Sequence, residues 1–127
     1  MNSWDLRALG LRPHSPQILC TTGDARAIAL EIPAGESLED HQVHERAWVT
    51  VIAGEVEITT TGGEKVVGGP GLMVEFAPRE RHAVRARSTA RLLLLLTPWP
   101  GPGHPGAMDL KAKAQARQRA AEHKASP

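Results

Sequence analysis

The sequence predicts an all-β protein, and three observations lead to that prediction. The 127-residue chain contains twelve glycines and ten prolines, which favours short strands joined by frequent tight turns. Several segments alternate apolar and polar residues with a period of two, as strands with one solvated face do. No helical segment is expected before residue 107. Together these observations indicate a closed or double-sheet all-β architecture.

The first half of the chain carries four expected strands. Two of them, 18–22 and 25–32, are separated by the turn residues Thr22-Gly23-Asp24. The second of these strands alternates isoleucine and leucine with alanine and glutamate, so one of its faces is more apolar than the other. Residues 48–60 contain two further strands on either side of Ala53-Gly54-Glu55.

The second half continues from a hairpin turn at 61–64, where the sequence reads TGGE. Four more strands are expected at 65–67, 72–77, 81–87 and 91–97. Pro78 bends the second of these away from the third. The last strand contains five consecutive leucines, Leu92–Leu96, which fits burial on both faces: one against the interior and one against another element or subunit.

The domain organisation follows from length and composition. The chain fits one domain, a β-barrel with N-terminal strands over residues 1–106, followed by a basic C-terminal helix or tail over 107–127. The junction at 98–106 reads PWPGPGHPG and is too rich in proline for a helix or a central strand. Residues 107–125 are rich in alanine, lysine, arginine and glutamine, which favour a helix.

Charge and cysteine content limit the expected surroundings. A formal net charge of +1 gives no global reason to expect nucleic acid or an anionic membrane as a partner. Cys20 is the only cysteine, which excludes an internal disulfide and fits a reducing compartment. The N-terminus lacks the apolar core of a signal peptide, and Leu92–Leu96 is too short to span a bilayer. A soluble cytoplasmic protein is therefore expected.

Two stretches, GESLEDHQVHERAWVTVIAG at 35–54 and GLMVEFAPRERHAVRA at 71–86, resemble the two signature segments of the cupin superfamily. The residues in agreement are Gly35, His41 and Gly54 in the first stretch and Gly71, Pro78 and His82 in the second. The resemblance covers 29–97. It implies a small RmlC-like domain, a cupin-type double-stranded β-helix (jelly-roll barrel), here with a short C-terminal helix.

The same resemblance implies a metal site with four usual ligands, of which His41 and His82 are in place. Val43 stands where the family has its second histidine, and Ala47 stands where it has a glutamate. In the second stretch Pro78 sits one residue late, Arg79 occupies a place where glycine is common, and no asparagine follows. Apolar side chains cannot donate to a metal, and two imidazoles alone make a weak site.

Two alternatives for the interior follow. In one regular strand from residue 41 to 51, alternate residues share a face, which predicts an apolar ligand pocket. Its residues are His41, Val43, Ala47, Val49, His82 and Val84. A bulge between Gln42 and Glu45 would instead turn His44 inward, giving a metal site of His41, His44 and His82 with Glu45 as a candidate carboxylate. The pocket is favoured; a divalent Fe, Mn, Ni or Zn ion belongs to the alternative.

Other polar residues have two interpretations each. His82 is either a hydrogen-bonded core histidine or a ligand or acid–base group. His104 is by default a surface residue and otherwise part of a lid over the pocket. The arginine-rich stretch 79–91 is a solvated strand face paired with glutamates or, alternatively, a site for an anionic substrate.

The favoured function is a small-molecule-binding cupin-domain protein with an interior pocket around His41 and His82. The alternative is a metal-dependent oxygenase or isomerase that acts on a small organic substrate, so enzymatic activity is left open. A third hypothesis is an interaction protein that uses the basic C-terminal helix. A homodimer is also predicted, because the leucine run has more apolar surface than one barrel interior absorbs.

Overall fold

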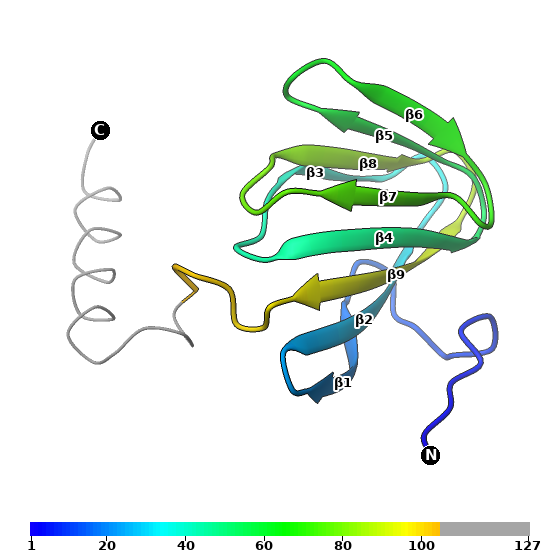
Figure 1. Cartoon of the computed structure of the whole chain (residues 1–127). Coiled ribbons are helices and arrows are strands. Elements are labelled where there is room, and N and C mark those ends of the chain that lie inside the picture. The colour runs from blue at the N-terminus through cyan, green and yellow to red at the C-terminus, as the bar shows by residue number, and fades with distance from the viewer. Residues whose placement is uncertain (105–127) are drawn as a thin grey trace, which may run out of the picture.

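Two antiparallel sheets face each other in the computed structural model, which describes residues 1–104 (Figure 1). The strands are β1 (Gln17–Thr22), β2 (Ala25–Ile32), β3 (Ser37–His41), β4 (Arg46–Ala53), β5 (Val56–Thr60), β6 (Lys65–Gly68), β7 (Met73–Phe76), β8 (His82–Ala86) and β9 (Ala90–Thr97). One sheet has the order β1-β2-β9-β4-β7, and the other has the order β3-β8-β5-β6. The all-β, two-sheet prediction is confirmed.

Strand β9 lies at the centre of the five-stranded sheet, between β2 and β4. In this register Leu94 stands opposite both Ile28 and Val49, so all three side chains face the other sheet. Leu93 and Leu95 point to the outer face, where Leu95 remains 40% exposed. The leucines of β9 were expected to be buried on both faces of the strand. In the single chain this holds for the inner face, whereas the outer face remains partly exposed to solvent.

The core between the sheets is built from the inward positions of both sheets. Its largest fully buried side chains are Phe76, Ile32, Leu92, Val51, Val56 and Val84, and Glu45 between β3 and β4 is also fully buried. Gly54 closes the β4–β5 turn with a φ of +78°, a region that favours glycine. A Cβ at this position would lie 2.7 Å from the Cα of Ala90, so the backbone of the neighbouring strand leaves no room for a side chain. The close backbone contact explains why the first signature segment has a glycine at position 54.

One local prediction is wrong. The chain does not run as a single strand from residue 41 to 51, because β3 ends at His41 and β4 begins at Arg46 in the opposite sheet. Residues 42–45 are the connection that crosses between the sheets, so the period-two rule does not extend across them. The register shift that does occur in this region lies earlier, between Leu38 and His41.

The N-terminal segment is fixed to strands β2 and β9 of the five-stranded sheet. Pro13 forms an isolated bridge with Glu31, and the guanidinium of Arg91 donates to the carbonyl oxygens of Leu6 and Arg7 at 3.0 Å. The helix predicted over 107–125 lies outside the described residues. Within the described part of the chain, no helix has the length and apolar character needed to cross a membrane.

Candidate functional site

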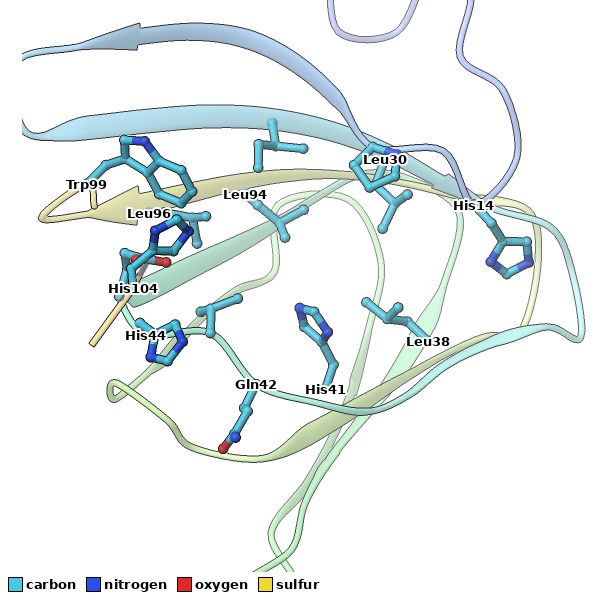
Figure 2. A pocket seen from close by; sticks show the side chains of 14 residues that line it. His14, Leu30, Leu38, His41, Gln42, His44, Leu94, Leu96, Trp99 and His104 are labelled. Atoms are coloured by element: carbon cyan, nitrogen blue, oxygen red, sulfur yellow. The ribbon is translucent and has the colours of Figure 1, made fainter. Parts of the chain in front are cut away.

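A cavity of about 310 Å³ opens between the inner faces of β2 and β9 and the β3–β4 connection (Figure 2). Its apolar wall comes mainly from the two central strands, which contribute Ile28, Leu30, Leu94 and Leu96. Its polar lining residues are His14, His41, Gln42, His44, Glu45 and His104. Figure 2 shows His44, His104 and Trp99 at one end, His14 at the other, and His41 between them. The site is thus an apolar cavity with imidazoles along its length.

His41 and His82, the two histidines that match the family signatures, lie next to each other. They face each other across the β3–β8 pair, with ring centroids 5.6 Å apart and planes at 84°. His82 is 4% exposed and stacks on Phe76 at 3.8 Å, and its Nδ1 is 3.0 Å from the carbonyl oxygen of Glu80. His82 is therefore a packed core residue with one ring nitrogen already engaged, whereas His41 borders the cavity.

Burial changes the protonation of both rings. Desolvation lowers the pKa of His41 below its ordinary value. Desolvation is also the main reason why the pKa of His82 is lowered, and the neighbouring His41 adds to the effect, while the contact with Glu80 opposes it. Both rings are consequently neutral at pH 7, where each offers one donor and one acceptor nitrogen.

The donor set does not fit the metal site that the resemblance implies. Among the described residues there is no group of three or more His, Cys, Asp or Glu side chains arranged to hold a metal ion. His41, His44 and His82 therefore do not converge as one ligand set, and Val43 packs against the apolar core. A ring stacked on Phe76 and bonded through Nδ1 leaves His82 with only Nε2 for any ligand.

One end of the cavity is bordered by a segment that we call the strap, residues 98–104. Glu45 is 1% exposed, and its Oε2 accepts a hydrogen bond from the backbone N–H of Gly101 at 2.7 Å. A Cβ on Gly101 would lie 2.7 Å from the carbonyl oxygen of His44 and 2.9 Å from that carboxylate oxygen. Only glycine fits so close an approach, so Glu45 holds the strap rather than completing a histidine cluster.

Three aromatic rings meet where the strap reaches the cavity. His44 and His104 lie edge to face, with centroids 5.8 Å apart and planes at 86°. The ring of His104 lies 4.6 Å from that of Trp99, and the guanidinium carbon of Arg26 sits 3.9 Å from the centroid of the Trp99 ring. Nδ1 of His44 is buried and has no hydrogen-bond partner among the described residues.

The predicted site residues divide into two groups. His41, Val43 and His44 line the cavity. Ala47, Val49, Val84 and His82 are buried in the core and are not among the side chains that line it. His44 faces the cavity because the chain leaves its strand, not because a strand bulges at residues 42–45.

Several lining residues carried no sequence signal for a pocket. Nothing in the local sequence marks Trp99 or His14 as a pocket residue, and the strap reads only as a proline-rich break, with His104 as a candidate for a lid. The placement of the strap depends on contacts with residues far away in the sequence, such as that between Gly101 and Glu45, which are 56 positions apart. The single usable signal was the pair of glycines at 101 and 103 among prolines, which indicates backbone in close contact with something.

The arginine-rich stretch is largely occupied by other contacts. Arg87 pairs with Glu55 at 3.2 Å and with Glu57 at 3.4 Å on the outer surface. Arg91 pairs with Glu31 at 3.1 Å. Arg79 donates to the carbonyl oxygen of Pro102 in the strap at 3.3 Å. These contacts favour the interpretation as a paired strand face over a site for an anionic substrate.

Fold and cavity together define a small barrel of the double-stranded β-helix class with an internal cavity. Residues 29–98 match the family model described as "Cupin domain", and the chain belongs to that family. The prediction of a cupin-type jelly roll is thereby confirmed. A comparison with curated protein sequences found no significant match.

Solved structures similar to this chain share its fold at low sequence identity. An RmlC-like cupin protein from Desulfovibrio desulfuricans is 19% identical with a TM-score of 0.69, over 77% of this chain and 97% of its own. The SPY1581 protein of Streptococcus pyogenes, of unknown function, is 20% identical with a TM-score of 0.63, over 76% and 86%. The DMSP lyase DddQ from Ruegeria pomeroyi is 20% identical with a TM-score of 0.65, over 80% and 56%. These likenesses concern the fold.

Proposed function

We propose that this cupin-domain protein binds a small, uncharged and mainly apolar organic molecule in the cavity, with a polar group of the ligand directed at His41. The observation that carries the proposal is a cavity of about 310 Å³ walled by leucine, isoleucine, valine and tryptophan side chains. This volume lies at the lower end of the range of small-molecule sites, which combine an apolar lining with a few placed polar groups.

The protonation of His41 favours an uncharged ligand. Its ring is neutral at pH 7 because burial lowers its pKa. It makes no hydrogen bond with any described residue, so both ring nitrogens can serve a ligand hydroxyl or carbonyl. A charged ligand would lose its hydration in an apolar cavity, and a neutral imidazole does not compensate for that loss.

The binding test uses 2-naphthol and its saturated counterpart decahydro-2-naphthol, titrated by calorimetry at pH 7.5. With about eleven non-hydrogen atoms and roughly 0.4 to 0.6 kcal/mol for each, a dissociation constant of about 10 µM to 1 mM is expected. Leu94→Trp fills the cavity and should abolish binding of both probes. Leu95→Trp is the matched control, because it places the same side chain on the outer face of the same strand.

Two outcomes contradict the proposal. One is the absence of heat and of chemical shift changes with both probes at millimolar concentration. The other is equal binding by the wild type and Leu94→Trp, which would place the probes outside the cavity. Either result leaves the membership of the family untouched, because that rests on the fold and the sequence match.

A homodimer, a cytoplasmic location and a role for the basic residues 107–127 stay predictions. The dimer has one supporting observation: apolar side chains remain on the outer face of the five-stranded sheet, with Leu95 40% and Met73 62% exposed. A second copy of the chain pairing over this face would cover them. The mass in solution by light scattering at micromolar concentration distinguishes a dimer from a monomer.

A further inference from the structure

We propose that the strap is the specificity-determining element of the cavity, and that it selects a ligand with a planar aromatic ring system. In this assignment Trp99 and His104 form the recognition surface, and Glu45 and Arg79 are positioning residues. The inference rests on the proposed binding function and names the chemical class of its ligand. It depends on how the strap is anchored and on which rings it presents.

Trp99 is held in place before any ligand arrives. Its backbone N–H donates to the carbonyl oxygen of Asp24 at 2.6 Å, which ties it to the β1–β2 turn. The Arg26 guanidinium lies over the indole ring, and Arg26 is itself fixed by a 2.9 Å hydrogen bond from Nε to Oγ1 of Thr21. The indole thus packs against Arg26 while also lining the cavity (Figure 2). Such preorganisation lowers the entropy lost on binding.

The strap is clamped on its other side by two long-range contacts. The buried Glu45 carboxylate holds the N–H of Gly101, and the Arg79 guanidinium donates to the carbonyl oxygen of Pro102. Arg79 adopts a φ of +64°, a conformation that favours glycine. Arginine at a position whose backbone favours glycine is explained if the arginine side chain has a role. The contact of this side chain with the carbonyl oxygen of Pro102 indicates that the role is to hold the strap.

The aromatic rings at the strap end are oriented so that a further aromatic ring can pack against them. Trp99 and His104 lie at 60°, and His104 and His44 lie at 86°. Tilted and edge-to-face arrangements of this kind are the ones that aromatic pairs prefer, because ring edges carry positive and ring faces negative charge. A planar ring entering the cavity can extend the series, whereas a saturated ring of similar size gains only the burial of its apolar surface.

The experiment compares the affinity ratio of 2-naphthol to decahydro-2-naphthol between variants, so that differences in probe hydration cancel. Replacing Trp99→Leu should lower this ratio about threefold to tenfold relative to the wild type, the range that one aromatic pair contributes. Trp4→Leu is the matched control, because Trp4 lies in the N-terminal segment and is not part of the cavity wall. It should leave the ratio unchanged.

A second variant tests the positioning role without removing the indole. Glycine suits the backbone of residue 79, so Arg79→Gly should fold, lose the contact with Pro102 and lower the ratio about twofold. Amide hydrogen exchange should become faster at Gly101 and Gly103 but not at Val49 in the core. If Arg79 only supported the general fold, Arg79→Gly would change amide exchange in both the strap and the core. The affinity ratio of the two probes would then stay unchanged.

The outcomes separate the two proposals. A wild type that binds both probes, with a ratio unchanged in Trp99→Leu and Arg79→Gly, overturns the specificity of the strap and leaves cavity binding intact. A wild type that binds neither probe overturns the binding function, and the present inference with it. Should Trp99→Leu fail to fold, the ratio and the exchange pattern of Arg79→Gly decide alone.

Discussion

Two parts of the polar interior, the His41–His82 pair and the strap end, differ in how their residues are used. The pair His41–His82, which the family signatures pick out, is held in the barrel wall, and His82 is stacked on Phe76 with one nitrogen bonded. The strap end, which no signature marks, brings a buried carboxylate and three aromatic rings together at one end of the cavity. Two of the four signature positions hold the apolar residues Val43 and Ala47, His82 is packed against Phe76, and the strap presents Trp99 and His104 to the cavity.

The largest predicted effect is a loss of folding stability when the packing around His82 is removed. Replacing Phe76→Ala removes a fully buried ring and the surface on which His82 stacks, so the free energy of unfolding should fall by about 3–5 kcal/mol. Urea denaturation followed by circular dichroism measures it. Met73→Ala on the same strand, 62% exposed, should change the free energy by less than about 0.5 kcal/mol. Similar values for both variants would contradict the packing role.

The next effect tests the strap end. Gly101→Ala forces a Cβ against the carbonyl oxygen of His44 and the carboxylate of Glu45, so unfolding should become about 1–3 kcal/mol more favourable. Gly10→Ala is the matched control, since a Cβ there meets nothing within 4 Å. If Gly101→Ala were as stable as the wild type, the close approach of strap and connection would not exist in solution.

The smallest effect concerns pH. The pKa values of His41 and His82 are lower in the folded chain than in the unfolded chain, where histidine titrates near 6.5, so the unfolded state binds more protons as the pH falls. The stability contribution of the two neutral rings is complete above about pH 6.5 and is lost as the pH falls through their folded-state values. Urea denaturation at several pH values between 7.5 and 5 should show declining stability, with a shallower decline in a His41→Gln, His82→Gln variant. An equal decline in both proteins would mean that these rings are not the cause.

Much of the fold could be predicted because it depends on local pattern. The alternation in 25–32 gave the bounds of β2, and the five leucines at 92–96 gave the central strand β9. The resemblance around Gly35, Gly54 and His82 supplied the arrangement of strands. Each of these signals is contained in a short stretch of sequence, so no knowledge of distant contacts was needed.

The site could be predicted less well because it depends on distant contacts. The stretch HQVHE continues an alternating pattern, so nothing local reveals that the strand ends at His41 and that the chain crosses to the other sheet. The strap sequence PWPGPGHPG excludes regular structure but does not say where the segment lies. Its position is set by Glu45, Arg79 and Asp24, which are 23 to 75 residues distant from their strap partners.

The most direct test of the central claim is a crystal structure of the wild type grown with 2-naphthol. The predicted result is a probe inside the cavity, its hydroxyl within hydrogen-bond distance of a ring nitrogen of His41 and its rings against Trp99 and His104. A probe bound elsewhere on the surface, or a cavity closed by its own side chains while the probe is present at saturating concentration, would contradict it.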